Sequence, residues 1–128
     1  MNNKILIVDD CPDTCLLMQV ILELNNFNVD IADNAVLGLS KIRNSPPNVV
    51  ITDNMMPDMD GCEFLRCIRT SNEYDYLPVL MVSGFDEADI IANSQYKFDA
   101  FIQKPIVPNR LVEIVNKVLN LNYEANPP

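Results

Sequence analysis

The chain contains no histidine and only three glycines among its 128 residues. Without histidine, a zinc site of mixed cysteine and histidine ligands is excluded. Three glycines also argue against a nucleotide-binding enzyme, which would need a glycine-rich phosphate loop. Apolar residues make up 48% of the chain, but they come in short runs, and residues 5–8 form the longest clean one. We therefore expect a folded protein with no membrane-spanning segment.

Positive charge is scarce as well. Nine Lys and Arg residues face 18 Asp and Glu residues, which gives a net charge of −9. Binding to nucleic acid phosphates needs clustered Lys and Arg, so we expect no direct nucleic acid binding. A metal cation or a basic partner surface suits the chain better. Residues 1–4 lack a signal-peptide pattern, and we therefore expect a cytoplasmic location.

The four cysteines are Cys11, Cys15, Cys62 and Cys67. Three residues separate the first pair and four the second, whereas zinc sites use pairs separated by two. We expect reduced cysteines that act as small apolar side chains. Cys11 and Cys62 each lie beside a motif residue, so an influence of their oxidation on a site stays open.

Short apolar runs alternate with stretches of helical periodicity along the chain. Strands are predicted at residues 4–8, 28–32, 48–52, 78–82 and 100–102. Helices are predicted at residues 12–25, from a cap at Asn34 to a break at 45–47, and at 62–70, 87–94 and 107–121. This alternation predicts an α/β fold, a parallel sheet with helices on both faces. We expect one domain over residues 1–122 and a short polar tail over residues 123–128.

Polar residues follow the predicted strands at the points where they end. Asp9 and Asp10 follow the first strand and Asp53 follows the third, while Ser83 and Lys104 end the last two. Ligands of open α/β sheets bind at the carboxyl ends of the strands. Three carboxylates in one crevice repel each other, and Mg²⁺ relieves this because it prefers carboxylates, carbonyls, waters and phosphate oxygens as ligands. The pattern therefore favours a magnesium site.

Each of these residues also has an ordinary interpretation. The acids occur commonly as loop residues or helix caps, Lys104 as a surface charge, and Ser83 as a turn residue before Gly84. However, a cis bond before Pro105 would aim the lysine across the crevice, where its ammonium could neutralise phosphoryl oxygens. The Ser83 hydroxyl could donate a hydrogen bond to the same group. Their joint placement at strand ends favours the functional interpretation.

Four segments together resemble the receiver domain of bacterial-type response regulators: residues 8–10, 51–61, 80–84 and 101–105. The resemblance extends over about residues 4–121. It implies a flavodoxin-like, doubly wound five-stranded parallel sheet in the order 2-1-3-4-5 with five helices. The chain departs from the family at Asp99, where glycine is common, and at Ser83, where threonine is commoner.

The resemblance also implies the roles of individual residues. Asp53 would be the phosphoacceptor, Ser83 and Lys104 would bind phosphoryl oxygens, and Phe101 would form a switch together with Ser83. Gly61 matches the turn glycine of the family. The implied magnesium ligands are Asp9, through a bound water, Asp10, Asp53 and the backbone carbonyl of Met55.

As a receiver, the chain would be a signalling module that catalyses its own phosphorylation and dephosphorylation, and not a classical enzyme. Because it has no histidine, the phosphohistidine donor would be a sensor histidine kinase or a histidine phosphotransfer protein, and a downstream protein would read the signal. We expect Cys11, Pro105 and Ile106, with Cys15, to form an apolar patch that docks the donor.

Three other classes of protein share part of this pattern. A degenerate receiver would bind partners without phosphorylation, but the acids, Ser83 and Lys104 are all present. An aspartyl-phosphate hydrolase of the haloacid dehalogenase class would carry D-x-D-x-T, whereas Asp10 and Cys11 follow Asp9. A flavin-binding module would carry a Ser/Thr/Gly-rich loop after the first strand, where residues 11–13 are Cys-Pro-Asp.

Overall fold

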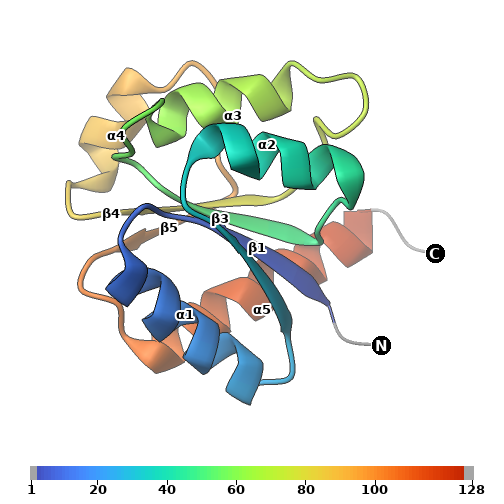
Figure 1. The fold of residues 1–128 in the computed structure, drawn as a ribbon, viewed down its shortest axis with the longest axis vertical. Helices are drawn as coiled ribbons and strands as arrows, with labels where there is room; N and C mark the ends of the chain where they lie inside the picture. The colour runs from blue at the N-terminus through green and yellow to red at the C-terminus, as the bar shows by residue number, and fades with distance from the viewer. Residues whose placement is uncertain (1–2, 126–128) are drawn as a thin grey trace.

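Five parallel strands form one sheet in the order β2-β1-β3-β4-β5 in the computed structural model, which describes residues 3–125 (Figure 1). This confirms the predicted fold class and strand order. The strands are β1 (Lys4–Val8), β2 (Asn28–Ala32), β3 (Val49–Asp53), β4 (Val79–Ser83) and β5 (Ala100–Gln103).

The five helices begin and end close to where the sequence predicts them. α1 begins with Pro12, and α2 is capped by the Asn34 side chain, which accepts a hydrogen bond from the Leu37 N–H at 2.8 Å. None of the helices within residues 3–125 is long and apolar enough to cross a bilayer. The helices are α1 (Pro12–Leu24), α2 (Ala35–Asn44), α3 (Gly61–Arg69), α4 (Glu87–Asn93) and α5 (Pro108–Ala125).

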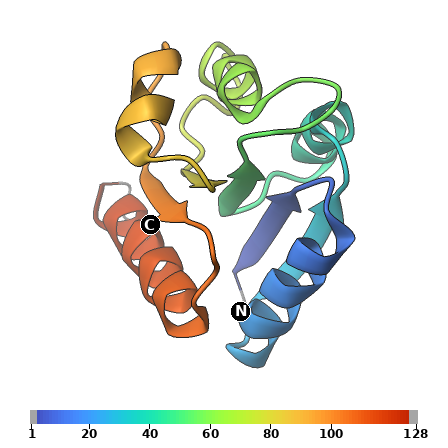
Figure 2. The same cartoon turned by 90° about the vertical axis from the view of Figure 1, so that its left-hand side faces the viewer.

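The helices cover both faces of the sheet. α1 and α5 lie on one face, and α2, α3 and α4 lie on the other, as the turned view also shows (Figure 2). Alternate residues of β1 enter the two cores, Ile5 and Ile7 on the α1 and α5 side. Leu6 and Val8 enter the core on the α2 and α3 side. A strand buried on both faces reads as one continuous apolar run, which explains the pattern of residues 5–8.

α5 continues past its predicted end at residue 121 and includes residues 123–125 of the predicted tail. Polar residues do not by themselves stop a helix. The first proline after residue 121 is Pro127, and a proline disfavours helical geometry in the residue before it. The helix prediction therefore ended too early, and residues 126–128 of the predicted tail lie outside the described residues.

Candidate functional site

The adjacent strands β1 and β3 bring three acids together at their carboxyl ends. Val8 of β1 pairs with Thr52 of β3, so the residue that follows each of them lies at the same edge of the sheet. One carboxylate oxygen of each of Asp9, Asp10 and Asp53 lies within 4.8 Å of the others. Asp9 and Asp53 are buried, whereas Asp10 is exposed. The acid cluster predicted from the strand ends is therefore present in the fold.

Asp9 has the feature that best fits a cation site. Its Oδ1 accepts a hydrogen bond from the Cys11 N–H at 2.9 Å, but its Oδ2 is buried without a hydrogen-bond partner among the described residues. Burial raises the pKa of Asp9, the Cys11 N–H opposes the rise, and the charge of Asp53 adds to it. Buried polar atoms normally have partners, and a divalent cation with its bound waters would supply one for Oδ2. An all-oxygen cluster of this kind fits Mg²⁺.

Asp53 belongs to this cluster and is also in contact with a lysine. Its Oδ1 accepts a hydrogen bond from the Asn54 N–H at 3.0 Å and lies 3.3 Å from the Nζ of Lys104. The bond between Lys104 and Pro105 is cis, and the Lys104 N–H donates to the Ser83 carbonyl at 2.8 Å. The structure thus confirms that Lys104 reaches across the crevice to Asp53.

Ser83 ends β4, next to β3, and is buried. Its Oγ accepts a hydrogen bond from the Phe85 N–H at 3.0 Å. The hydroxyl keeps its own hydrogen as a donor. No hydrogen bond joins Ser83 to Asp53 within residues 3–125, so a group bound on Asp53 would be needed to bridge them.

The loop after Asp53 is held close to the strand by Gly61. The Gly61 N–H donates to the Asn54 carbonyl at 2.8 Å. A Cβ atom at this position would lie 2.5 Å from the Asp53 carbonyl oxygen and 2.9 Å from the Met81 sulfur. A side chain would therefore push the loop away from the strand. Close approach, and not an unusual backbone angle, explains why this turn needs glycine.

Phe101 and Asp99 lie where the resemblance places the switch and its variable neighbour. Phe101 is half-buried on β5, and its ring centroid lies 6.0 Å from that of Phe98. Asp99 does not have a left-handed backbone. Among the described non-glycine residues, a positive φ occurs at Asn26 and not at Asp99. Its Oδ2 instead accepts the Val79 N–H at 2.7 Å and pairs with Arg69 at 2.8 Å. The sequence analysis missed this ion pair, since nothing local connects residues 30 positions apart.

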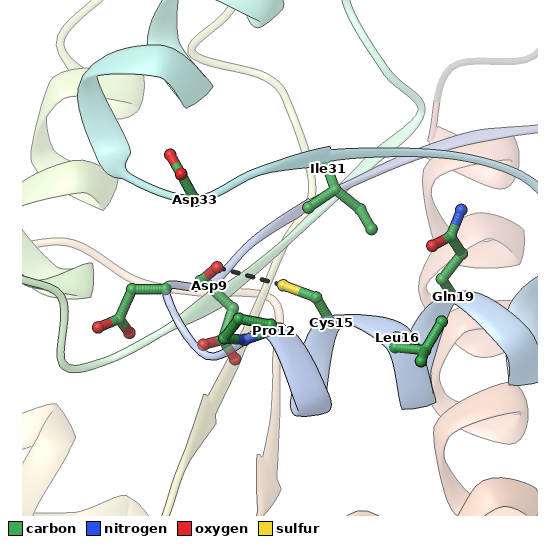
Figure 3. Close-up of a pocket in the computed structure, with 8 residues that line it drawn as sticks. Asp9, Pro12, Cys15, Leu16, Gln19, Ile31 and Asp33 are labelled. Atoms are coloured by element: carbon green, nitrogen blue, oxygen red, sulfur yellow. Dashed lines mark hydrogen bonds between the residues drawn. The ribbon is translucent and has the colours of Figure 1, made fainter.

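Of the four predicted docking residues, Cys11 and Pro105 are exposed and Ile106 is half-buried. Cys15 is buried, and its thiol donates to the Asp9 carbonyl at 3.2 Å (Figure 3). The prediction that Cys15 contacts a partner is therefore wrong, because its position on α1 faces the sheet together with Met18.

A pocket of about 270 Å³ opens beside the acids. It lies between the start of α1 and the end of β2, and Cys15 forms part of its wall (Figure 3). All four cysteines, including Cys15 in this wall, are free thiols. The pocket is lined by Asp9, Asp10, Pro12, Cys15, Leu16, Gln19, Ile31 and Asp33.

A doubly wound sheet with an acid cluster at the carboxyl ends of β1 and β3 and a lysine after β5 defines a receiver-type fold. The family model of the response regulator receiver domain matches residues 5–116. The chain therefore belongs to the response regulator receiver domain family, the signalling modules of two-component systems, which interact with histidine kinases and generally bind Mg²⁺ at an acidic pocket.

Curated relatives agree with this assignment. The chain is 36% identical over 118 residues to response regulator Rre1 of Synechocystis sp.. The aligned region covers 91% of this chain and 51% of that relative. It is 33% identical over 129 aligned positions to response regulator GtcR of Aneurinibacillus migulanus. That alignment covers 100% of this chain and 52% of GtcR. The chain thus spans about half the length of these two relatives.

Solved structures agree as well. A CheY-like response regulator receiver domain protein from Methanospirillum hungatei is 30% identical in sequence. The match has a TM-score of 0.87 and covers 98% of this chain and 100% of that one. The similarity therefore extends over the whole receiver fold and not only over the motifs.

Proposed function

We propose that this chain accepts a phosphoryl group on Asp53 from a phosphohistidine of a sensor histidine kinase or a histidine phosphotransfer protein. One observation carries the proposal: the Asp53 carboxylate lies 3.3 Å from the Lys104 ammonium and within the acid cluster. A carboxylate oxygen of Asp53 attacks phosphorus, the phosphorus–nitrogen bond of the donor breaks, and the donor imidazole leaves with the electron pair. The product is an acyl phosphate on Asp53.

Charge neutralisation is what such a site has to supply, because the transition state of phosphoryl transfer spreads negative charge over the phosphoryl oxygens. The Lys104 ammonium and the Ser83 hydroxyl would bind two of these oxygens. Asp9, Asp10, Asp53 and the Met55 carbonyl would hold Mg²⁺, which supplies further positive charge when bound. The unpartnered Oδ2 of Asp9 supports this ligand set.

Intact mass after incubation with a small phosphodonor and Mg²⁺ tests the proposal. The wild-type chain should gain one phosphoryl group, and the Asp53→Asn variant should gain none. Asp10→Ala should weaken Mg²⁺ binding and slow labelling. Undiminished labelling in excess chelator, or in Asp53→Asn, would contradict the proposal, and no labelling of the wild type would favour a degenerate receiver.

Phosphorylation would also switch the surface around β5. A phosphoryl group on Asp53 offers the Ser83 hydroxyl a new acceptor, and movement of Ser83 would leave room for Phe101 to turn inward from its contact with Phe98. Such a population shift would present a different surface to a downstream protein. A fluorine label on Phe101 should show two environments whose ratio changes on phosphorylation. A single unchanged environment would remove Phe101 from the switch.

We propose that the direct partners of this chain are proteins and not nucleic acids. One relative, MtrA of Mycolicibacterium smegmatis, is a DNA-binding response regulator, and the chain spans 54% of its length. The net charge of −9 opposes contact between this chain itself and DNA phosphates. Salt-dependent binding of the isolated chain to duplex DNA would contradict this.

A further inference from the structure

Asp58 lies in the loop between β3 and α3, but its carboxylate reaches the N-terminus of another helix, α2. Its Oδ2 accepts a hydrogen bond from the Val36 N–H at 2.9 Å, and its Oδ1 lies 3.3 Å from the Ala35 N–H, which also donates to it. These contacts join residues 22 and 23 positions apart in the chain. α2 has no acidic residue in its own first turn. Asp58 therefore supplies the negative charge that the positive end of α2 favours.

The contact completes the capping of α2. The first N–H groups of a helix have no partner within the helix. Asn34 accepts from the third of them, that of Leu37, and Asp58 accepts from the first two. The caps come from two different places in the chain, so removal of either one leaves the other in place. Only the Asp58 cap also ties down a loop.

That loop carries the carbonyl expected to bind Mg²⁺. Its two ends are fixed, because the Asn54 N–H donates to the Val82 carbonyl at 3.1 Å and the Asp60 side chain caps α3 by accepting the Glu63 N–H at 2.8 Å. Met55 follows the first fixed point, and the residue is 61% exposed. The two bonds of Asp58 are the hydrogen bonds that join this loop to α2 within residues 3–125.

We propose that Asp58 is a positioning residue, which holds the loop on α2 so that the Met55 carbonyl stays in place for Mg²⁺. The inference rests on the proposed function, because it takes the metal site from there. Asp58 is not part of the acid cluster. It acts through the backbone between residues 55 and 58, and it links the metal site to the first turn of α2.

Mg²⁺ titration by calorimetry of the wild type, Asp58→Ala and Asn34→Ala tests the proposal. Loss of Asp58 should weaken Mg²⁺ binding by about tenfold, the lower end for residues that orient metal ligands. Asn34→Ala is the matched control, since it also removes a cap of α2 but leaves the loop attached. Asn34→Ala should change Mg²⁺ affinity by less than about twofold, because the loop that orients the metal ligand stays attached. Asp58→Asn keeps an acceptor oxygen and should lie between the wild type and Asp58→Ala.

Amide hydrogen exchange gives a second readout, which does not depend on phosphorylation. Mg²⁺ should slow exchange at the Val36 amide of the wild type, because a fixed loop holds its Asp58 cap in place. This slowing should disappear in Asp58→Ala. Equal Mg²⁺ affinity in the wild type and both Asp58 variants would overturn the inference. Failure of the wild type to bind Mg²⁺ would overturn the proposed function instead, so the two failures are distinguishable.

Discussion

At the scale of single residues, Asp9 shows how the site opposes the stability of the fold. Burial raises the pKa of Asp9 above its ordinary value of 3.8. Below that value Asp9 is protonated in both the folded and the unfolded chain. Between that value and the higher pKa of the folded state, Asp9 ionises in the unfolded chain first, so the stability of the folded chain falls as the pH rises through this range. A bound cation would offset this cost.

Asp9→Asn should therefore stabilise the metal-free chain at neutral pH. The difference in unfolding free energy between the variant and the wild type should grow from acidic to neutral pH, in urea titrations with chelator present. Excess Mg²⁺ should shrink the difference, since the metal stabilises the wild type more. A difference that stays constant over this pH range would show that Asp9 ionises without cost.

Met55 and Phe85 belong to the same scale, and we expect them to set how long the phosphoryl group lasts. The two residues are 61% and 52% exposed, and they follow Asp53 and Ser83 by two residues. Hydrolysis needs a water held in line with phosphorus, which a thioether and a phenyl ring orient poorly. Met55→Asn combined with Phe85→Glu should shorten the lifetime about tenfold, equivalent to about 1.4 kcal/mol of barrier.

The decay of the phosphorylated mass after removal of donor measures this lifetime, at matched Mg²⁺ and temperature. Met55→Leu combined with Phe85→Leu is the control, because it keeps apolar bulk at both positions and should leave the lifetime nearly unchanged. If the polar double variant loses phosphate no faster than the wild type, the two side chains do not shield the site.

At the scale of elements, Arg69 joins the end of α3 to the segments on both sides of β4. Its guanidinium donates to the carbonyls of Asp75 at 3.1 Å and Leu77 at 2.5 Å, which lie before β4. It also donates to the Lys97 carbonyl at 3.2 Å and pairs with Asp99 at 2.8 Å, just before β5. The Arg69 side chain is only 16% exposed. Arg69 therefore helps to hold the segment that leads into Phe101, together with the two hydrogen bonds between Asp99 and Val79.

Arg69→Ala should lower the free energy of unfolding by about 2 kcal/mol, because it leaves three carbonyls and a carboxylate without their charged partner. Amide exchange at residues 97–99 should also become faster. Arg66→Ala is the control on the same helix. Within residues 3–125 Arg66 forms an ion pair only with its neighbour Glu63, near the surface, so its loss should matter little. Equal urea midpoints for the Arg69 variant and the wild type would show that the contacts contribute nothing.

At the scale of the whole molecule, all groups of the site lie at the carboxyl edge of the sheet, so a donor protein has to approach that edge. Cys11 and Pro105 are exposed beside it, and Ile106 is half-buried there. Ile106→Asp should slow phosphoryl transfer from the cognate protein at least about tenfold, the equivalent of about 1.4 kcal/mol. The rate with a small phosphodonor should stay nearly unchanged.

Comparison of the two donors separates docking from damage to the site. Leu24→Asp is the control for added charge, because Leu24 is 79% exposed at the far end of α1. It should leave both rates unchanged. Equal slowing of Ile106→Asp with both donors would indicate that the substitution disturbs Lys104 and not the docking of a partner.

The fold and the centre of the site were predictable because their signals are local in sequence. A strand buried on both faces requires a continuous apolar run, and the runs before Asp9 and Asp53 both end abruptly on an acid. Once the strands are parallel, their carboxyl ends meet at one edge, so the acids and Lys104 converge there. The end of α5 was less predictable, because a helix end depends on weak local preferences.

The sequence by itself determined the strands, the edge at which the acids gather and the residues able to carry phosphoryl chemistry. Only the tertiary structure decided which side chains meet across elements. It buried Cys15 against the sheet, joined Arg69 to Asp99, and placed Asp58 on the first turn of α2. Periodicity reports which face of an element is apolar, but it does not report which distant polar groups that packing brings within hydrogen-bond distance.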